Sequence, residues 1–226
     1  MSAQDPTDGA NLSLAQAQAM DRMYRLQRHV YDASRRFYLL GRDRLIDELD
    51  VPEGGSVLEI GCGTGRNLEK AAQRYPTARI HGVDISHEML KSAGVAVTRA
   101  GLTRRISIAQ GDALSFSGLR SFGVQSFDRV YFSYTLSMIP PWQQALQHAV
   151  DLVATGGALH VADFGQCEGL PRGFRAGLFA WLLQFHVTPR EGLPAEMERL
   201  ARRIDGAAAS FEAGHRGYDW HLALRR

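Results

Sequence analysis

The chain has 226 residues, 45% of them hydrophobic, and a formal net charge of +2 with a sequence pI near 8.7. This length fits one enzyme-sized domain and falls short of two comfortable cores. The charge is too mild for nucleic-acid binding by electrostatics alone. The two cysteines form no metal-ligand spacing and no disulfide framework. We expect no signal peptide and no membrane-spanning segment, which together fit a reduced cytoplasmic setting.

Taken in chain order, the sequence predicts an α/β protein. We expect residues 1–12 to be disordered, residues 13–50 to form a helical cap whose helix spans residues 13–49, and residues 51–226 to form the main domain. The expected strands span residues 57–60, 79–83, 106–109, 129–132, 158–162, 210–213 and 218–224, and the expected helices span residues 67–74, 86–100 and 142–154. This alternation predicts a seven-stranded, mostly parallel sheet with helices on both faces and an antiparallel hairpin at one edge.

A glycine-rich turn follows the first expected strand. Residues 57–65 read VLEIGCGTG, in which Gly61, Gly63 and Gly65 let the backbone turn with no side chain in the way of a ligand. Asp84 ends the next strand, where an acidic residue in doubly wound sheets accepts the two hydroxyls of a ribose. The pattern therefore predicts a nucleotide-binding turn.

The spacing of the glycines favours one class of nucleotide. A dinucleotide site has G-x-G-x-x-G, whereas this chain has G-x-G-x-G with Arg66 where the third glycine would stand. Glu59 would repel a diphosphate but suits the ammonium of a methionine moiety. Together with Asp84 and the later residues 111–113 (GDA), the turn resembles the cofactor motifs of class I S-adenosylmethionine-dependent methyltransferases. A dinucleotide site and a degenerate fold are the alternatives.

This resemblance implies a Rossmann-like fold, S-adenosylmethionine as the cofactor, and no metal. Ile85 and Ala113 would sandwich the adenine, and Asp112 would accept a hydrogen bond from its amino group. An aspartate after a glycine is also ordinary turn chemistry, which is the alternative for Asp112. The implied cofactor-binding residues are Glu59, Gly61, Gly63, Gly65, Asp84, Ile85, Asp112 and Ala113.

The end of the fourth expected strand bears on the acceptor. Residues 131–136 read YFSYTL and lack the Asn-Pro-Pro-aromatic tetrad that grips planar amines, so base and amide methylation are disfavoured. We expect Tyr134 and Asp163 at the mouth of the sheet, because ligands sit at the carboxyl ends of such strands.

Aromatic and basic residues recur in the N-terminal region. Two sets repeat every seven residues and would each lie along one face of a helix: Tyr24, Tyr31 and Tyr38, and Arg28, Arg35 and Arg42. Ring faces attract an alkylammonium, and guanidinium groups pair with carboxylate or phosphate. The alternative is that the tyrosines are half-buried core and the arginines a solvated face.

Three segments carry a more specific resemblance. Residues 20–46 (MDRMYRLQRHVYDASRRFYLLGRDRLI), 131–142 (YFSYTLSMIPPW) and 185–190 (FHVTPR) resemble the bacterial betaine-lipid methyltransferases, which convert diacylglycerylhomoserine to diacylglyceryl-N,N,N-trimethylhomoserine. The likeness runs from about residue 20 to the end. It implies three successive N-methylations of one primary amine with three molecules of cofactor.

Site residues for this chemistry can be proposed from the sequence. We expect Tyr24 and Tyr31 to cage the amine, with Tyr134 and Asp163 nearby as further catalytic candidates. The candidates for binding the substrate are Arg25, Arg28, Arg35 and His186. His186 could accept a proton, although a lone histidine is more often a packing or hydrogen-bonding residue.

A lipid substrate requires contact with a membrane. Residues 174–185 are rich in Phe, Leu and Trp with only Arg172 and Arg175 nearby, too short to span a bilayer but suited to an interfacial or acyl-covering helix. A core helix is the alternative. We expect a cytoplasmic protein, peripheral at the inner face of the membrane. Its partners would be the homoserine lipid, the membrane surface and the upstream aminocarboxypropyl transferase, but no nucleic acid.

Other functions remain open at this point. A phosphatidylethanolamine N-methyltransferase, or one acting on another amine, would share fold, cofactor and membrane surface. A non-catalytic S-adenosylmethionine-binding partner is a second alternative, which the intact cofactor residues disfavour. A nucleic-acid methyltransferase is a third, disfavoured by the mild charge.

Overall fold

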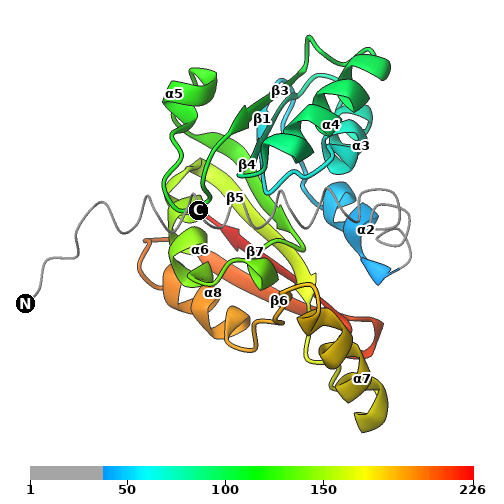
Figure 1. Cartoon of the computed structure of the whole chain (residues 1–226). Coiled ribbons are helices and arrows are strands. Elements are labelled where there is room, and N and C mark those ends of the chain that lie inside the picture. Colours follow the sequence, from blue (N-terminus) through cyan, green and yellow to red (C-terminus); the bar gives the residue numbers. More distant parts are fainter. Residues whose placement is uncertain (1–37) are drawn as a thin grey trace, which may run out of the picture.

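The computed structural model describes residues 38–226, which contain one seven-stranded sheet (Figure 1). The strands are β1 Ser56–Ile60, β2 Arg79–Asp84, β3 Ile106–Gln110, β4 Phe127–Ser133, β5 Val153–Phe164, β6 Ala208–Gly214 and β7 Asp219–Arg225. Their order across the sheet is β3-β2-β1-β4-β5-β7-β6. Strand β7 is antiparallel to both of its neighbours, and the other neighbouring pairs are parallel.

This strand order places a topological switch point between β1 and β4. The chain builds outward from β1 to β2 and β3, and then returns to place β4 on the other side of β1. The helices that follow β1 and β4 therefore lie on opposite faces, which leaves a crevice at the carboxyl ends of these two strands. Ligands of open α/β sheets bind in this crevice.

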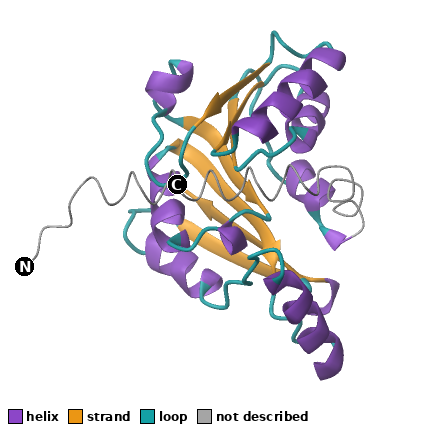
Figure 2. Cartoon of the chain, in the orientation of Figure 1, coloured by secondary structure: helices purple, strands orange, loops and turns teal. Residues whose placement is uncertain are grey.

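Helices cover both faces of the sheet (Figure 2). They are α2 Arg42–Asp47, α3 Arg66–Arg74, α4 His87–Arg99, α5 Gly118–Phe122, α6 Trp142–Asp151, α7 Arg172–Leu183 and α8 Leu193–Ala201, with single 3-10 turns at Leu136–Met138 and His215–Gly217. Successive strand side chains point to opposite faces. Val57 accordingly packs in a core with α2, α3 and α4, whereas Leu58 and Ile60 pack with α6 and α8. Because helices cover both of its faces, the central strand β4 is buried along almost its whole length, whereas the edge strand β6 is mostly exposed.

The fold expected from the sequence is confirmed, including the seven strands and the antiparallel edge. Ser86 also caps α4 as expected, accepting a hydrogen bond from the Met89 backbone N–H at 3.2 Å. The helix expected over residues 142–154 is wrong at its end, because α6 stops at Asp151 and Val153 already pairs with Phe127. The apolar residues between these points fit a helix or a strand equally well.

The N-terminal helix expected over residues 13–49 is not continuous. Residues 1–37 lie outside the described part of the chain, and within that part α2 begins only after Gly41, whose φ is 71°. A Cβ at Gly41 would stand 2.3 Å from His221 Nε2, so glycine is required both for the backbone angle and for close approach to β7. Tyr38 and Arg42 therefore lie on opposite sides of a break and do not extend their stripes along one helix.

Candidate cofactor and acceptor site

The glycine turn at the end of β1 is fixed by its neighbours. The backbone N–H groups of Gly61 and Cys62 donate to the carbonyl of Val83 at 2.8 and 3.0 Å. Gly61, Gly63 and Gly65 have φ values of 78°, 53° and 83°, which side chains strongly disfavour. The turn is therefore held against the end of β2 and presents main-chain atoms to the crevice, as the sequence predicts.

Asp84 joins the turn to β2. Its Oδ2 accepts the Gly63 N–H at 2.8 Å, and its Oδ1 accepts the Ser86 N–H at 2.9 Å. A carboxylate offers about four acceptor positions, and acceptance of the hydroxyls of a ribose by Asp84 stays a prediction. Asp84 therefore positions the turn as well as being the candidate ribose acceptor.

The expected adenine contacts come from the loops after β2 and β3, which are neighbouring parallel strands. Ile85 and Ala113 are both half-buried there. Asp112 Oδ1 accepts the Leu114 N–H at 2.9 Å, which is the turn contact named as its alternative role. Whether Asp112 also reaches an adenine stays a prediction.

Glu59 is the most unusual group of the crevice. Its side chain is 1% exposed, its Oε1 accepts from Asn67 Nδ2 at 2.8 Å, and its Oε2 has no hydrogen-bond partner within the described chain. Burial raises the pKa of Glu59 to about 8, against the opposing effect of the Asn67 hydrogen bond. The buried hydroxyl of Tyr131 on β4 lies close enough to Glu59 to oppose this rise as well, and the hydroxyl of Ser133 is buried and unpartnered within residues 38–226.

Tyr134 and Asp163 lie at the ends of β4 and β5 but are more deeply enclosed than we expected. Tyr134 is 2% exposed, has a φ of 56°, and donates its hydroxyl to the Leu40 carbonyl at 2.6 Å. Asp163 is 1% exposed and accepts the backbone N–H groups of Ser137 and Phe164 at 3.0 and 2.8 Å. Their contacts in the structure are those of positioning residues, and direct contact with an acceptor stays a prediction.

Arg190 is a functional candidate that the sequence interpretation did not single out, although it ends the FHVTPR segment. Its Nε donates to the Leu136 carbonyl at 3.1 Å, and its Nη2 donates to the carbonyls of Ser137 and Ile139 at 3.3 and 2.7 Å. Burial lowers its pKa, against the opposing charge of Asp163. Arg190 thereby fixes the loop that follows β4, opposite the glycine turn.

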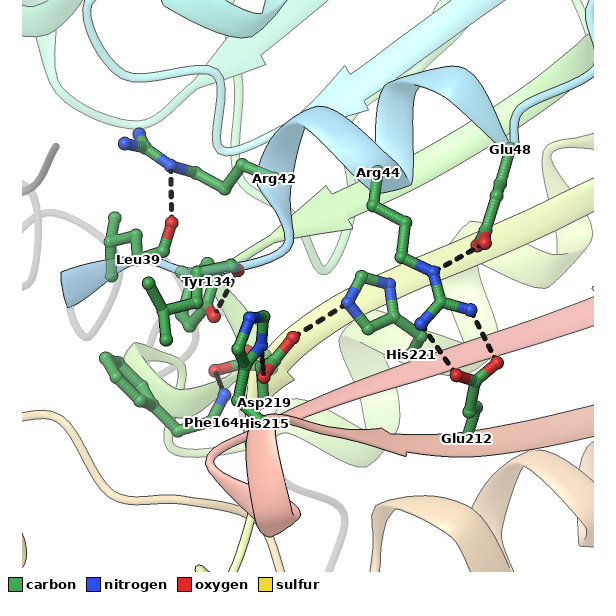
Figure 3. Close-up of polar contacts among 12 residues, drawn as sticks. Leu39, Arg42, Arg44, Glu48, Tyr134, Phe164, Glu212, His215, Asp219 and His221 are labelled. Atoms are coloured by element: carbon green, nitrogen blue, oxygen red, sulfur yellow. Dashed lines mark hydrogen bonds and ion pairs between the residues drawn. The ribbon is translucent and has the colours of Figure 1, made fainter. Parts of the chain in front are cut away.

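Side chains of β6 and β7 fasten α2 to the edge of the sheet (Figure 3). Asp219, 1% exposed, accepts from His215 Nδ1 at 2.7 Å and from His221 Nε2 at 3.0 Å. Burial opposes ionisation of Asp219, but these two partners hold its pKa below the usual range. Arg44 of α2 pairs with Glu212 of β6 at 2.7 Å. The cluster sets the position at which the N-terminal region joins the domain.

The expected amine cage and carboxylate site cannot be placed. Tyr24, Tyr31, Arg25, Arg28 and Arg35 lie outside the described residues. His186 is described: it follows α7, is exposed, and has a φ of 56°. Its proposed contact with substrate stays a prediction.

Comparisons with known proteins agree with this geometry. Residues 57–157 match the family described as methyltransferase domain. Aklanonic acid methyltransferase DauC of Streptomyces sp. (strain C5) is 34% identical over 147 residues, 65% of this chain and 60% of that protein. Trans-aconitate 2-methyltransferase of Deinococcus radiodurans is 33% identical over 113 residues, 49% of this chain and 39% of that protein. The chain thus spans less than two thirds of the length of either relative.

Solved structures show the same fold. An O-methyltransferase family protein from Burkholderia thailandensis superposes with a TM-score of 0.66 at 18% identity, covering 86% of this chain and 58% of that chain. Residues 57–157 are thus similar to a methyltransferase domain, and the chain shares the fold of solved S-adenosylmethionine-dependent methyltransferases, which supports S-adenosylmethionine as the cofactor. The crevice suits this group, because the unpartnered Glu59 Oε2 can accept from an ammonium while Asp84 can accept from ribose hydroxyls.

Proposed function

Because residues 57–157 match the methyltransferase domain family, we propose that this chain methylates the primary amine of diacylglycerylhomoserine with S-adenosylmethionine as the methyl donor. Three successive transfers would give the betaine lipid diacylglyceryl-N,N,N-trimethylhomoserine. The proposal includes a peripheral position at the inner face of the membrane. It also includes receipt of the lipid from the upstream aminocarboxypropyl transferase.

One observation carries the choice of substrate. The segments 131–142 and 185–190, which resemble betaine-lipid methyltransferases, are far apart in the chain but bonded to each other. The Thr188 N–H donates to the Ser137 carbonyl at 2.9 Å, next to the contacts of Arg190 with the same loop. A Cβ at Gly61 would stand 2.3 Å from Thr135 Cγ2, so this loop borders the cofactor turn. The more specific likeness thus falls on one wall of the cofactor crevice.

The reaction requires little acid–base catalysis from the protein. When bound, the cofactor would supply an electrophilic methyl group on a sulfonium sulfur. The neutral amine would form the new C–N bond as the C–S bond breaks. Each of the first two products would lose a proton to water, and the third would keep its positive charge as a quaternary ammonium. Glu59 would hold the ammonium of the cofactor's methionine moiety, and Asp84 would hold its ribose hydroxyls. Tyr134, Asp163 and Arg190 hold the wall at which the amine approaches, which is the positioning that such a displacement needs.

The proposal places the remaining contacts on the N-terminal region. The ring faces of Tyr24 and Tyr31 stabilise the cation that grows with each methyl group, worth about 0.5–2 kcal/mol for each ring. One of Arg25, Arg28 and Arg35 pairs with the homoserine carboxylate. These roles require the full chain, because all five residues precede residue 38.

Turnover with defined lipids tests this function. The full chain is incubated with S-adenosylmethionine and either diacylglycerylhomoserine or phosphatidylethanolamine in detergent micelles. The masses of the lipid products are then measured by mass spectrometry. We expect the homoserine lipid to gain one, two and then three methyl groups while phosphatidylethanolamine stays unchanged. Methylation of phosphatidylethanolamine alone would overturn the substrate. Cofactor binding without turnover of any amine would favour a non-catalytic binding partner.

A second candidate follows from the relatives. Both reported relatives are named for acids, aklanonic acid and trans-aconitate, so methylation of a carboxylate is the competing reaction. The two reactions give chemically different products, because mild alkali cleaves a methyl ester and leaves an N-methyl group in place. An alkali-labile methyl group on the homoserine headgroup would establish the second candidate.

A further inference from the structure

Helix α7 combines an apolar sequence with unusual exposure. Its twelve residues, RGFRAGLFAWLL, include no acidic residue, and its second half is apolar around the whole circumference. Helices of this kind are normally buried in a core or a membrane. Yet Leu182 is its only buried residue, and Phe174 and Leu183 are 49% and 60% exposed. The described residues 38–226 therefore leave most of this helix uncovered.

The helix is attached at one end and stands out at the other. Trp181 packs edge-on against Tyr38 with ring centroids 4.9 Å apart, and against Phe185 at 5.0 Å. Residues 171–177, by contrast, are exposed at every position. Figure 1 shows α7 standing out from the body beyond the carboxyl end of β5. The uncovered helix thus leaves the same rim of the sheet that holds the cofactor crevice.

The charge on α7 itself is of one sign. Its two charged residues are Arg172 and Arg175, and the nearest acidic residues in the sequence, Glu168 and Glu191, lie outside the helix. At the base of the helix the Gly169 N–H donates to the Arg216 carbonyl at 3.0 Å, and Glu168 lies beside Gly217 at the same place, so Arg172 and Arg175 supply the positive charge of this surface. An apolar helix that carries arginines is complementary to an anionic lipid surface, whose acyl region is apolar and whose headgroups are negatively charged.

We propose that α7 is the membrane-docking element of this protein, inserting Phe174 and Leu183 into an anionic bilayer while Arg172 and Arg175 contact the headgroups. No helix within residues 38–226 is long and apolar enough to cross a bilayer, so the contact is interfacial. The inference rests on the proposed function, since it explains how a lipid amine reaches the crevice. A soluble protein partner is the competing occupant of the helix.

Vesicle binding of the full chain tests the proposal. The probes are vesicles of phosphatidylcholine alone and of phosphatidylcholine with about one third phosphatidylglycerol, at low and high salt. We expect strong sedimentation only with the anionic vesicles, weakened by salt. Phe174→Glu and Leu183→Glu should each lower this binding about tenfold or more.

Matched controls separate docking from general loss of hydrophobicity. Val95 of α4 and Leu119 of α5 are as exposed as the α7 pair, at 56% and 59%, and Val95→Glu and Leu119→Glu should leave vesicle binding unchanged. Equal losses from all four variants would overturn the proposal. Equal binding, or no binding, of the parent to neutral and anionic vesicles would overturn it as well.

A direct reporter keeps the test independent of charge substitution. The emission of a polarity-sensitive dye on Phe174→Cys should shift to the blue with anionic vesicles, and the emission of the same dye on Val95→Cys should not.

Turnover of homoserine lipid in detergent micelles distinguishes membrane docking by α7 from the proposed function. If the α7 variants retain turnover in micelles but lose it on vesicles, both stand; if the parent docks but never methylates this lipid, only the proposed function fails.

Discussion

Replacing Glu59 by glutamine should stabilise the cofactor-free protein and weaken its cofactor binding. The side chain is 1% exposed, and its Oε1 accepts a hydrogen bond from Asn67 Nδ2 at 2.8 Å. Burial raises the pKa of Glu59 from 4.5 to about 8. Glutamine keeps the shape and an oxygen for Asn67, but it carries no group to ionise. The substitution therefore isolates the cost of holding this carboxyl in the core.

The size of the effect follows from proton linkage. The unfolded chain loses this proton at the ordinary pKa of 4.5, whereas the folded chain keeps it up to about pH 8. The folded state therefore loses stability, relative to the unfolded state, as pH rises through this window. With about 1.4 kcal/mol for each pH unit, the cost is about 1 kcal/mol at pH 5, about 3 kcal/mol at pH 7 and about 4 kcal/mol at pH 8. Glu59→Gln should remove a cost that grows in this way.

Cofactor binding should favour the ionised carboxylate of Glu59, which the cofactor-free protein disfavours. An ammonium beside Glu59 Oε2 favours the carboxylate, so binding at pH 7 should release about one proton in the parent and none through this site in Glu59→Gln. Loss of the charged partner should weaken affinity by about 10- to 100-fold, the value of a hydrogen bond to a charged group. The residue would then be an example of stability given up for binding.

Two measurements check this reasoning. Urea unfolding of the cofactor-free parent and Glu59→Gln at several pH values should give a stability difference that widens from pH 5 to pH 8. Calorimetry in buffers of different ionisation enthalpy should show proton release on cofactor binding only in the parent. The exposed Glu53→Gln is the control and should match the parent in both. A stability difference independent of pH, or equal affinity in Glu59→Gln, would refute the reasoning.

Three further predictions concern the cofactor turn and the amine site. Asp84→Ala should weaken S-adenosylmethionine binding by about 1.5–3 kcal/mol, because the ribose hydroxyls lose a charged acceptor; unchanged affinity by calorimetry would remove Asp84 from the site. Gly61→Ala should destabilise the fold by more than Gly101→Ala in urea unfolding. Both have positive φ, but a Cβ at Gly61 would stand 2.3 Å from Thr135 Cγ2, whereas one at Gly101 meets nothing within 4 Å; equal losses would show that backbone strain alone matters. Tyr31→Phe should retain most activity on homoserine lipid and Tyr31→Leu should not, because the ring face stabilises the cation; inactive Tyr31→Phe would assign the role to the hydroxyl.

Local features were predictable from the sequence because a few consecutive residues encode them. The apolar run before Gly61, the glycine spacing and the acid at Asp84 specify a strand, a turn and a ribose site within about thirty residues. Ser86 as a helix cap is equally local. The mostly parallel sheet and its antiparallel edge followed from the alternation of strands and helices, whereas the order of the strands came only from the structure. Fold class and cofactor were therefore determined by the sequence itself.

Partners across the fold were decided by tertiary structure. Gly41 breaks the expected N-terminal helix because the backbone there meets His221, 180 positions later in the chain. Asp163 was expected to face an acceptor, but the loop that follows β4 supplies Ser137 to bond it. Periodicity states which face of an element is apolar and not what that face will meet. The neutral carboxyl of Glu59 likewise arises from burial, which no local pattern records, so its poised state is a property of the assembled sheet.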